Sequence, residues 1–114
     1  MSTKSRREQI EAMLADAPND PELRYMLAME HASAGDDAAC VVVLQELIAR
    51  PAATPYVPAF LQAGQALVRL DRIAEAVAVL RQGIDIAGKA GDEMSLDLAR
   101  RFVWFCRQGA FEIL

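Results

Sequence analysis

The sequence predicts an all-α protein whose antiparallel helix hairpins stack side by side as a short solenoid of about six helices. Three observations predict it. Apolar positions recur after 36 residues, so that Ala28 aligns with Gly64 and Leu44 with Leu80. Hydrophobic residues make up 54% of the 114 residues, yet aromatic residues only 6%, and alanine is common, which favours helices over strands. Apolar side chains follow helical spacing. Repeats of this length are typical of stacked arrays.

Residues 5–17 are expected to form an N-terminal capping helix. Ser5 and Glu8 have the spacing of a capping box, in which each side chain accepts a hydrogen bond from the other residue's backbone N–H. The helix is expected to end near Pro18. One face carries the apolar side chains Ile10, Met13, Leu14 and Ala17.

The first repeat is expected over residues 21–54. Asp20 is an N-cap acceptor before Pro21, Gly35 is suited to the left-handed end of a helix, and Asp36 or Asp37 caps the next helix. A connection of two or three residues requires an antiparallel hairpin. The expected buried faces are Leu23, Met26, Leu27, His31 and Ala34 on the first helix, and Cys40, Val41, Leu44, Leu47 and Ile48 on the second.

The second repeat is expected over residues 55–90. Its first helix starts around Tyr56 to Pro58, because proline is tolerated only in the first turn. Asp71 and Arg72 turn the chain into the second helix, which ends at Gly91. The expected buried faces are Phe60, Ala63, Gly64 and Leu67, followed by Ile73, Ala76, Val77, Leu80, Ile84 and Ala87.

A C-terminal helix is expected over residues 92–108, capped by Asp92 and followed by a hydrophobic tail, 109–114. Its apolar residues nearly surround it. In one rotation Leu98, Phe102, Phe105 and Cys106 form a buried stripe and Trp104 is exposed. In the other, Trp104 is buried and Phe105 is left outside. Either way a large apolar group stays uncovered, which predicts self-association or partner docking. The candidate contact residues are Arg101, Trp104, Gln108 and Phe111.

Charge and composition narrow the function classes. Sixteen acidic and 12 basic residues give a net charge of −4, the wrong sign for a general nucleic-acid binder. No apolar run reaches the roughly 18 residues of a membrane span, and no signal peptide is seen, so a cytoplasmic protein is expected. Two cysteines and one histidine leave little for a metal site, and we expect no cofactor. Between Asp16 and Glu46 seven acids face one base, which indicates either partner steering or solvated helix faces.

The two hairpins resemble tetratricopeptide repeats, of the kind found in small bacterial proteins. Small residues stand at Ala28, Gly64, Cys40, Ala76 and Gly83, where helix axes approach closely. The usual tryptophan is absent, and Leu47 occupies a position that is normally small. The resemblance covers about residues 21–90. It implies a right-handed solenoid and a non-catalytic adaptor that binds a peptide or helix of a partner protein in a concave groove, which the first helix of each repeat lines.

Helical spacing places the candidate groove residues on one face, opposite much of the packed stripe, and this derivation does not depend on the resemblance. Arg69 is the one basic residue among these candidates, so a partner with apolar or aromatic side chains fits better than one held by a carboxylate clamp. The alternative for Tyr25 and Met29 is packing against a neighbouring helix. The candidate groove residues are Tyr25, Met29, Ser33, Leu61, Gln65, Val68 and Arg69.

Catalytic alternatives are weaker. His31 takes the family's tyrosine position between two helices and has no nucleophile beside it by local spacing. The segment 83–90 approaches a phosphate-loop pattern, but it ends a helix instead of starting one, and Ala90 lacks the required hydroxyl. No enzyme is therefore expected. The alternative function is a homodimeric scaffold assembled through the C-terminal helix.

Overall fold

The computed structural model describes residues 5–50 and 55–112, with side chains as far as residue 108. Every regular element in these ranges is an α-helix, which confirms the all-α prediction. The molecule is elongated, with principal extents of 51 × 35 × 20 Å. The helices are α1 (Arg6–Asp16), α2 (Pro21–Ser33), α3 (Asp37–Ala49), α4 (Val57–Arg69), α5 (Ile73–Ala90) and α6 (Glu93–Glu112).

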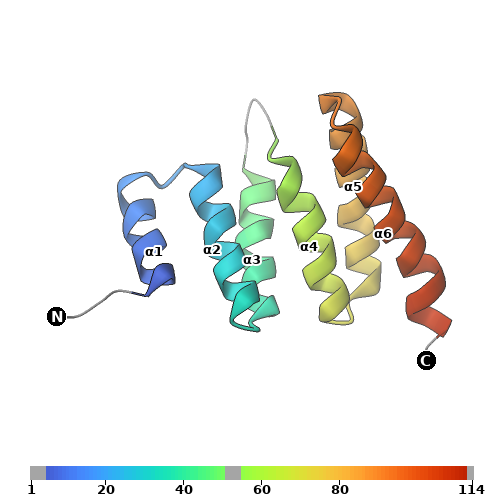
Figure 1. The fold of residues 1–114 in the computed structure, drawn as a ribbon, viewed down its shortest axis with the longest axis horizontal. Coiled ribbons are helices and arrows are strands. Elements are labelled where there is room, and N and C mark those ends of the chain that lie inside the picture. The colour runs from blue at the N-terminus through green and yellow to red at the C-terminus, as the bar shows by residue number, and fades with distance from the viewer. Residues whose placement is uncertain (1–4, 51–54, 113–114) are drawn as a thin grey trace.

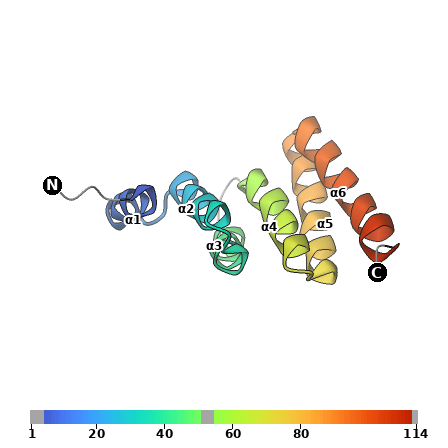
Figure 2. The same cartoon turned by 60° about the horizontal axis from the view of Figure 1, so that its bottom comes forward.

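The helices form a row in chain order, with α2/α3 and α4/α5 as two antiparallel hairpins (Figure 1). Each helix packs against the next one along the chain, and α4 also packs against α6. The turned view in Figure 2 shows the same succession, with α1 and α6 at opposite ends of the row. Contacts between sequential neighbours are what a stacked repeat requires.

The 36-residue interval extends beyond the two predicted repeats. Asp20, Tyr56 and Asp92 directly precede α2, α4 and α6, while Asp36 and Arg72 directly precede α3 and α5. Consequently α6, which we expected only as a C-terminal helix, lies in register as the first helix of a third repeat.

The predicted helix starts are confirmed. Ser5 and Glu8 form the capping box, with both hydrogen bonds at 3.1 Å. Asp20 accepts from the backbone N–H of Glu22 at 2.9 Å, and Asp36, the first of the two aspartates considered, accepts from that of Ala39 at 3.0 Å. Acidic caps also suit the positive end of the helix dipole.

The turns use backbone conformations with positive φ, which L side chains rarely adopt. Gly35 has φ 81° after α2, and Gly91 has φ 72° after α5, as the sequence predicts. Asp71, between α4 and α5, has φ 60° without being glycine. Aspartate is one of the few non-glycine residues that tolerates this region, so the short α4/α5 connection does not need glycine.

Two clusters of buried residues form the core. The first lies among α2, α3, α4 and α5 and includes Ala28, Cys40 and Leu44. The second joins α4, α5 and α6 and consists of Leu61, Leu80, Ala99 and Cys106. The first cluster is shared by the two hairpins and the second by the α4/α5 hairpin and α6, which matches the packing of a repeat stack.

Glycines allow α4 and α5 to approach closely within the second hairpin. A Cβ atom on Gly64 would lie 2.5 Å from Cγ and Cδ2 of Leu80. A Cβ atom on Gly83 would lie 3.0 Å from Cβ of Phe60. The small residues predicted at these positions are therefore needed for helix contact.

The orientation of α6 corrects both predicted rotations. Its buried residues are Ala99 and Cys106, with Phe102 and Val103 partly buried. Trp104 is 65% exposed, Phe105 47% and Leu98 38%, so the predicted stripe of Leu98, Phe102, Phe105 and Cys106 is wrong in part, and burial of Trp104 is wrong as well. The helix follows α5 with small Ala99 inward, which turns large side chains outward.

The helix α6 also continues four residues past its predicted end, through Gly109 to Glu112. An interior glycine costs about 1 kcal/mol relative to alanine, which lowers helix stability without ending the helix. The predicted tail 109–114 is therefore helical as far as residue 112. The side chain of Phe111, one of the candidate contacts, lies outside the described residues.

Smaller corrections concern partly exposed positions on the predicted faces. Met13 is exposed, and Ile10 is the one residue of α1 that is buried. Ala34 is also exposed. The residues on the predicted buried faces of the two repeats that are only partly buried are Leu23, Met26, Leu27, His31, Ile48, Ile73, Val77 and Ile84.

The acidic stretch from Asp16 to Glu46 is largely used within the fold. Asp20 and Asp36 cap helices. Three further acids form ion pairs, Glu30 with Arg6 at 3.4 Å, Asp37 with Arg69 at 2.9 Å and Glu46 with Arg24 at 3.7 Å. Because most of these acids cap helices or pair with arginines of the same chain, the structure favours the explanation by helix surfaces over steering of a partner.

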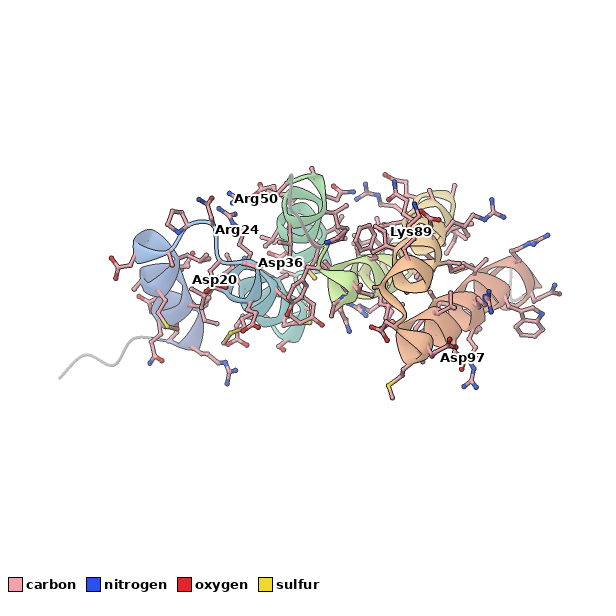
Figure 3. All side chains as sticks on the ribbon, turned by 90° about the horizontal axis from the view of Figure 1, so that it is seen from above. Asp20, Arg24, Asp36, Arg50, Lys89 and Asp97 are labelled. Carbon is pink, nitrogen blue, oxygen red and sulfur yellow. The ribbon has the colours of Figure 1, made fainter. Side chains whose placement is uncertain are left out.

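The α1/α2 turn is held by two arginines, one in α2 and one directly after α3 (Figure 3). Nε of Arg24 donates to the carbonyl oxygen of Pro18 at 3.0 Å. Arg50, at the end of α3, donates to the side-chain oxygen of Asn19 at 2.8 Å. The capping helix α1 is thus tied to the first hairpin through its connecting turn.

Candidate interaction surface

The predicted groove face begins at an aromatic pair between α2 and the start of α4. The rings of Tyr25 and Tyr56 lie 5.3 Å apart at an interplanar angle of 47°, a tilted arrangement that is favourable for aromatic rings. Tyr25 and Met29 are partly buried and pack against the first core cluster. Part of each side chain therefore packs against neighbouring helices, and the rest stays exposed.

Both phenols in this pair remain neutral. Burial raises the pKa of Tyr25, and Tyr56 adds to the effect, while a side-chain hydrogen bond with Gln62 lowers it. Burial also raises the pKa of Tyr56, and the nearby carboxylates of Glu22 and Asp20 act in the same direction. The pair thus offers apolar ring surface and uncharged hydroxyl groups.

Leu61 is not free for a partner. It is only 9% exposed and forms the second core cluster with Leu80, Ala99 and Cys106. The expectation that it lines an open groove is wrong, because α6 covers it. The 36-residue interval from Asp20 to Asp92 is the signal in the sequence that could have shown this, since it places α6 beside α4 as the next first helix.

A small hollow lies between α4 and α6. Its volume is about 190 Å³, and its lining is Gln65, Val68, Phe102 and Phe105. Gln65 and Val68 are predicted groove residues. Phe102 and Phe105 belong to the predicted buried stripe, although the alternative rotation leaves Phe105 outside, and neither residue is among the predicted groove residues. Three of the four lining side chains are apolar, which suits a hydrophobic ligand group.

The remaining groove candidates contribute less. Nε of Arg69 lies 2.9 Å from Oδ1 of Asp37, so its guanidinium joins the second hairpin to the first. Ser33 is exposed at the last turn of α2. The structure brings Tyr25 to Tyr56 and Gln65 to Val68, while Arg69 is engaged elsewhere.

The outer face of α6 carries the second group of candidates. Trp104 and Gln108 are exposed, and Arg101 pairs with Asp97, with its guanidinium nitrogen 3.0 Å from the carboxylate oxygen. Of the six exposed large hydrophobic side chains in the described part of the chain, four lie on α6: Met94, Leu98, Trp104 and Phe105.

The cysteine and histidine side chains, which are the candidates for catalysis or metal binding, are buried or partly buried. Cys40 and Cys106 are free, buried thiols, and burial raises the pKa of each. His31 is partly buried. Over the described ranges, no three His, Cys, Asp or Glu residues come together in a way that could hold a metal ion. No helix in the described part of the chain is both long enough and apolar enough to cross a membrane.

Stacked hairpins at a constant interval define this chain as an all-α helical-repeat protein. No family model and no curated protein matches its sequence. The chain is similar to the solution NMR structure of a tetratricopeptide repeat domain protein from Salinibacter ruber, with 28% identity and a TM-score of 0.71. The match covers 78% of this chain and 88% of that chain.

The fold is therefore tetratricopeptide-repeat-like, which confirms the resemblance predicted from the sequence. A fold of this kind is typical of non-catalytic protein-interaction modules.

Proposed function

We propose that this chain is a non-catalytic adaptor that binds a helix or an extended peptide of a partner protein. The binding surface runs across α2, α4 and α6, which are the first helices of the successive repeats. The observation that carries the proposal is the apolar hollow between α4 and α6, lined by Gln65, Val68, Phe102 and Phe105. The similarity to a tetratricopeptide repeat domain protein supports an interaction role.

The hollow suits one large apolar or aromatic side chain of the partner. The hollow measures about 190 Å³ and is partly open to solvent, so it covers part of such a side chain. Full burial of a large apolar side chain contributes roughly 1.5–3 kcal/mol, and partial burial here contributes less. The amide of Gln65 can hydrogen-bond to the partner's backbone and so orient the bound segment.

The aromatic pair of Tyr25 and Tyr56 supplies a second contact on the α2 side. Its rings add apolar surface, and its neutral hydroxyl groups can hydrogen-bond to a peptide. Met29 is partly buried on the same helix, and its flexible thioether can adapt to the partner. The favoured ligand therefore carries apolar or aromatic side chains rather than a carboxylate for a basic clamp.

We place this activity in the cytoplasm and away from nucleic acid. The two free thiols suit a reducing compartment, and the net charge of −4 opposes binding to a phosphate backbone.

Peptide selection tests the proposed groove. Peptides selected from a displayed library on the wild-type chain should bind about tenfold or more weakly to Phe105→Glu, because a carboxylate would enter an apolar hollow. Isothermal titration measures both affinities. The matched control is Val42→Glu, a similarly exposed apolar side chain on α3, and it should leave binding unchanged. Equal affinity for all three proteins would exclude the hollow as the binding site.

A second candidate function is self-association through α6. It is favoured by the four exposed large hydrophobic side chains on that helix. Their burial between two copies would remove the main apolar patch from water.

A further inference from the structure

The outer face of α6 repeats the positions through which α4 receives α6. On α4, Leu61 packs in the cluster that holds Ala99 and Cys106 of α6, and Gln65 and Val68 line the hollow with Phe102 and Phe105. The equivalent positions one interval later are Asp97, Arg101 and Trp104. These side chains therefore stand where the stack would accept another helix.

This face combines large apolar groups with one ion pair. Met94 is 77% exposed and Trp104 65%. Between them lie Asp97 and Arg101, one helical turn apart and paired at 3.0 Å. Helical spacing places all four within about one third of the helix circumference. Figure 3 shows Asp97 on the side of α6 that points away from the other helices.

The ion pair on this face has a direction along α6, because Asp97 lies one helical turn before Arg101. A parallel pair of these helices in register would place Asp97 beside Asp97 and Arg101 beside Arg101, whereas an antiparallel pair sets Asp97 of one copy beside Arg101 of the partner subunit.

We propose that the occupant of this face is a second copy of the same chain, with the two α6 helices antiparallel about a two-fold axis. The inference rests on the second candidate function, self-association through α6. In the register that sets Asp97 against Arg101 of the partner subunit, Met94 lies opposite Trp104 of the partner subunit. Both pairs occur twice, because a two-fold interface is self-complementary.

This register satisfies the charges and the apolar groups together. The two intramolecular Asp97–Arg101 pairs come side by side with opposite order, so four charges alternate in sign. On either side of them a thioether packs against an indole ring, a favourable contact for methionine. Each copy thereby covers the two most exposed large hydrophobic side chains of its described residues.

Charge exchange tests the pairing by sedimentation equilibrium on the full chain. The wild type should approach twice the chain mass as concentration rises. Asp97→Arg and Arg101→Asp should each dimerise about tenfold or more weakly, since each places like charges together across the two-fold axis. An equimolar mixture of the two variants should recover the dimer, and so should the double variant Asp97→Arg/Arg101→Asp.

The matched control is Asp85→Lys, which reverses the charge of one member of a similarly exposed i,i+4 pair, that of Asp85 with Lys89 on α5. It should leave dimerisation unchanged, and circular dichroism should show that every variant is folded. A wild-type chain that stays monomeric at all concentrations would overturn both the pairing and self-association. A dimer that persists in Asp97→Arg would overturn this register alone. Peptide binding at the hollow is read separately, by titration.

Discussion

The helices α2 and α4 occupy the same position in successive repeats and have the same length of 13 residues, yet they are buried very differently. In α2 the one buried residue is Ala28. In α4 seven residues are buried, because α3, α5 and α6 all pack against it. On its outer side α2 has only the short α1, whose one buried residue is Ile10. Burial in this stack therefore depends on neighbouring helices more than on position within the repeat.

The two helices also begin differently. Asp20 caps α2 through its carboxylate, whereas Tyr56 precedes α4 without a side-chain capping hydrogen bond. Packing against three neighbouring helices holds α4 in place, so its stability depends less on an N-terminal cap. At the less buried end of the stack, a cap worth about 1 kcal/mol is a larger share of what holds the helix in place.

Leucine truncation should show the contrast most strongly. Leu67→Ala in α4 removes a side chain that is 1% exposed and should lower the free energy of unfolding by about 2–5 kcal/mol. Leu27→Ala in α2, where the leucine is partly exposed, should cost about 1–2 kcal/mol. Urea denaturation of both variants measures the difference. Equal costs would mean that α2 is as tightly packed as α4.

Addition of one methyl group gives a smaller effect at equivalent positions. Ala28 in α2 already carries a Cβ atom, but one on Gly64 in α4 would meet Leu80 at 2.5 Å. Gly64→Ala should therefore cost about 1–3 kcal/mol through overpacking, despite the better helix propensity of alanine. The control Gly88→Ala meets nothing within 4 Å and should stabilise the chain by about 0.5–1 kcal/mol. A stabilising Gly64→Ala would contradict the close α4/α5 approach.

The smallest expected effect concerns the cap of α6. The backbone N–H of Ser95 and then its hydroxyl lower the pKa of Asp92 from its ordinary value of 3.8. A lowered carboxylate pKa stabilises the folded state above the unfolded pKa, and this contribution is lost as pH falls through the lower folded value. Asp92→Ala should therefore be less stable than the wild type at neutral pH, with the difference shrinking in acid. Thermal melts across pH measure it, and a constant difference would argue against the charged cap.

Local signals made most of the fold predictable. Ser5, Asp20 and Asp36 mark helix starts because each side chain bonds to backbone a few residues away. Gly35 and Gly91 mark helix ends for the same local reason. The 36-residue interval predicts the stacking order, since equivalent positions need equivalent neighbours.

The interaction surface was less predictable because it depends on how α6 lies against α4 and α5. Burial of Leu61 and exposure of Phe105 both follow from the inward placement of Ala99. Helical spacing within α6 allows several rotations, and the choice is made by side chains distant in sequence. Gln65 and Val68 could therefore be predicted as surface residues, but their phenylalanine neighbours could not.

Each core cluster contains one cysteine, Cys40 in the first and Cys106 in the second. Both thiols are buried, and their raised pKa values keep them protonated and unreactive while the clusters stay closed. Alkylation of each thiol by a maleimide therefore requires local opening around that residue. Labelling rates at the two positions would time the opening of the two halves of the stack independently, without any substitution in the chain.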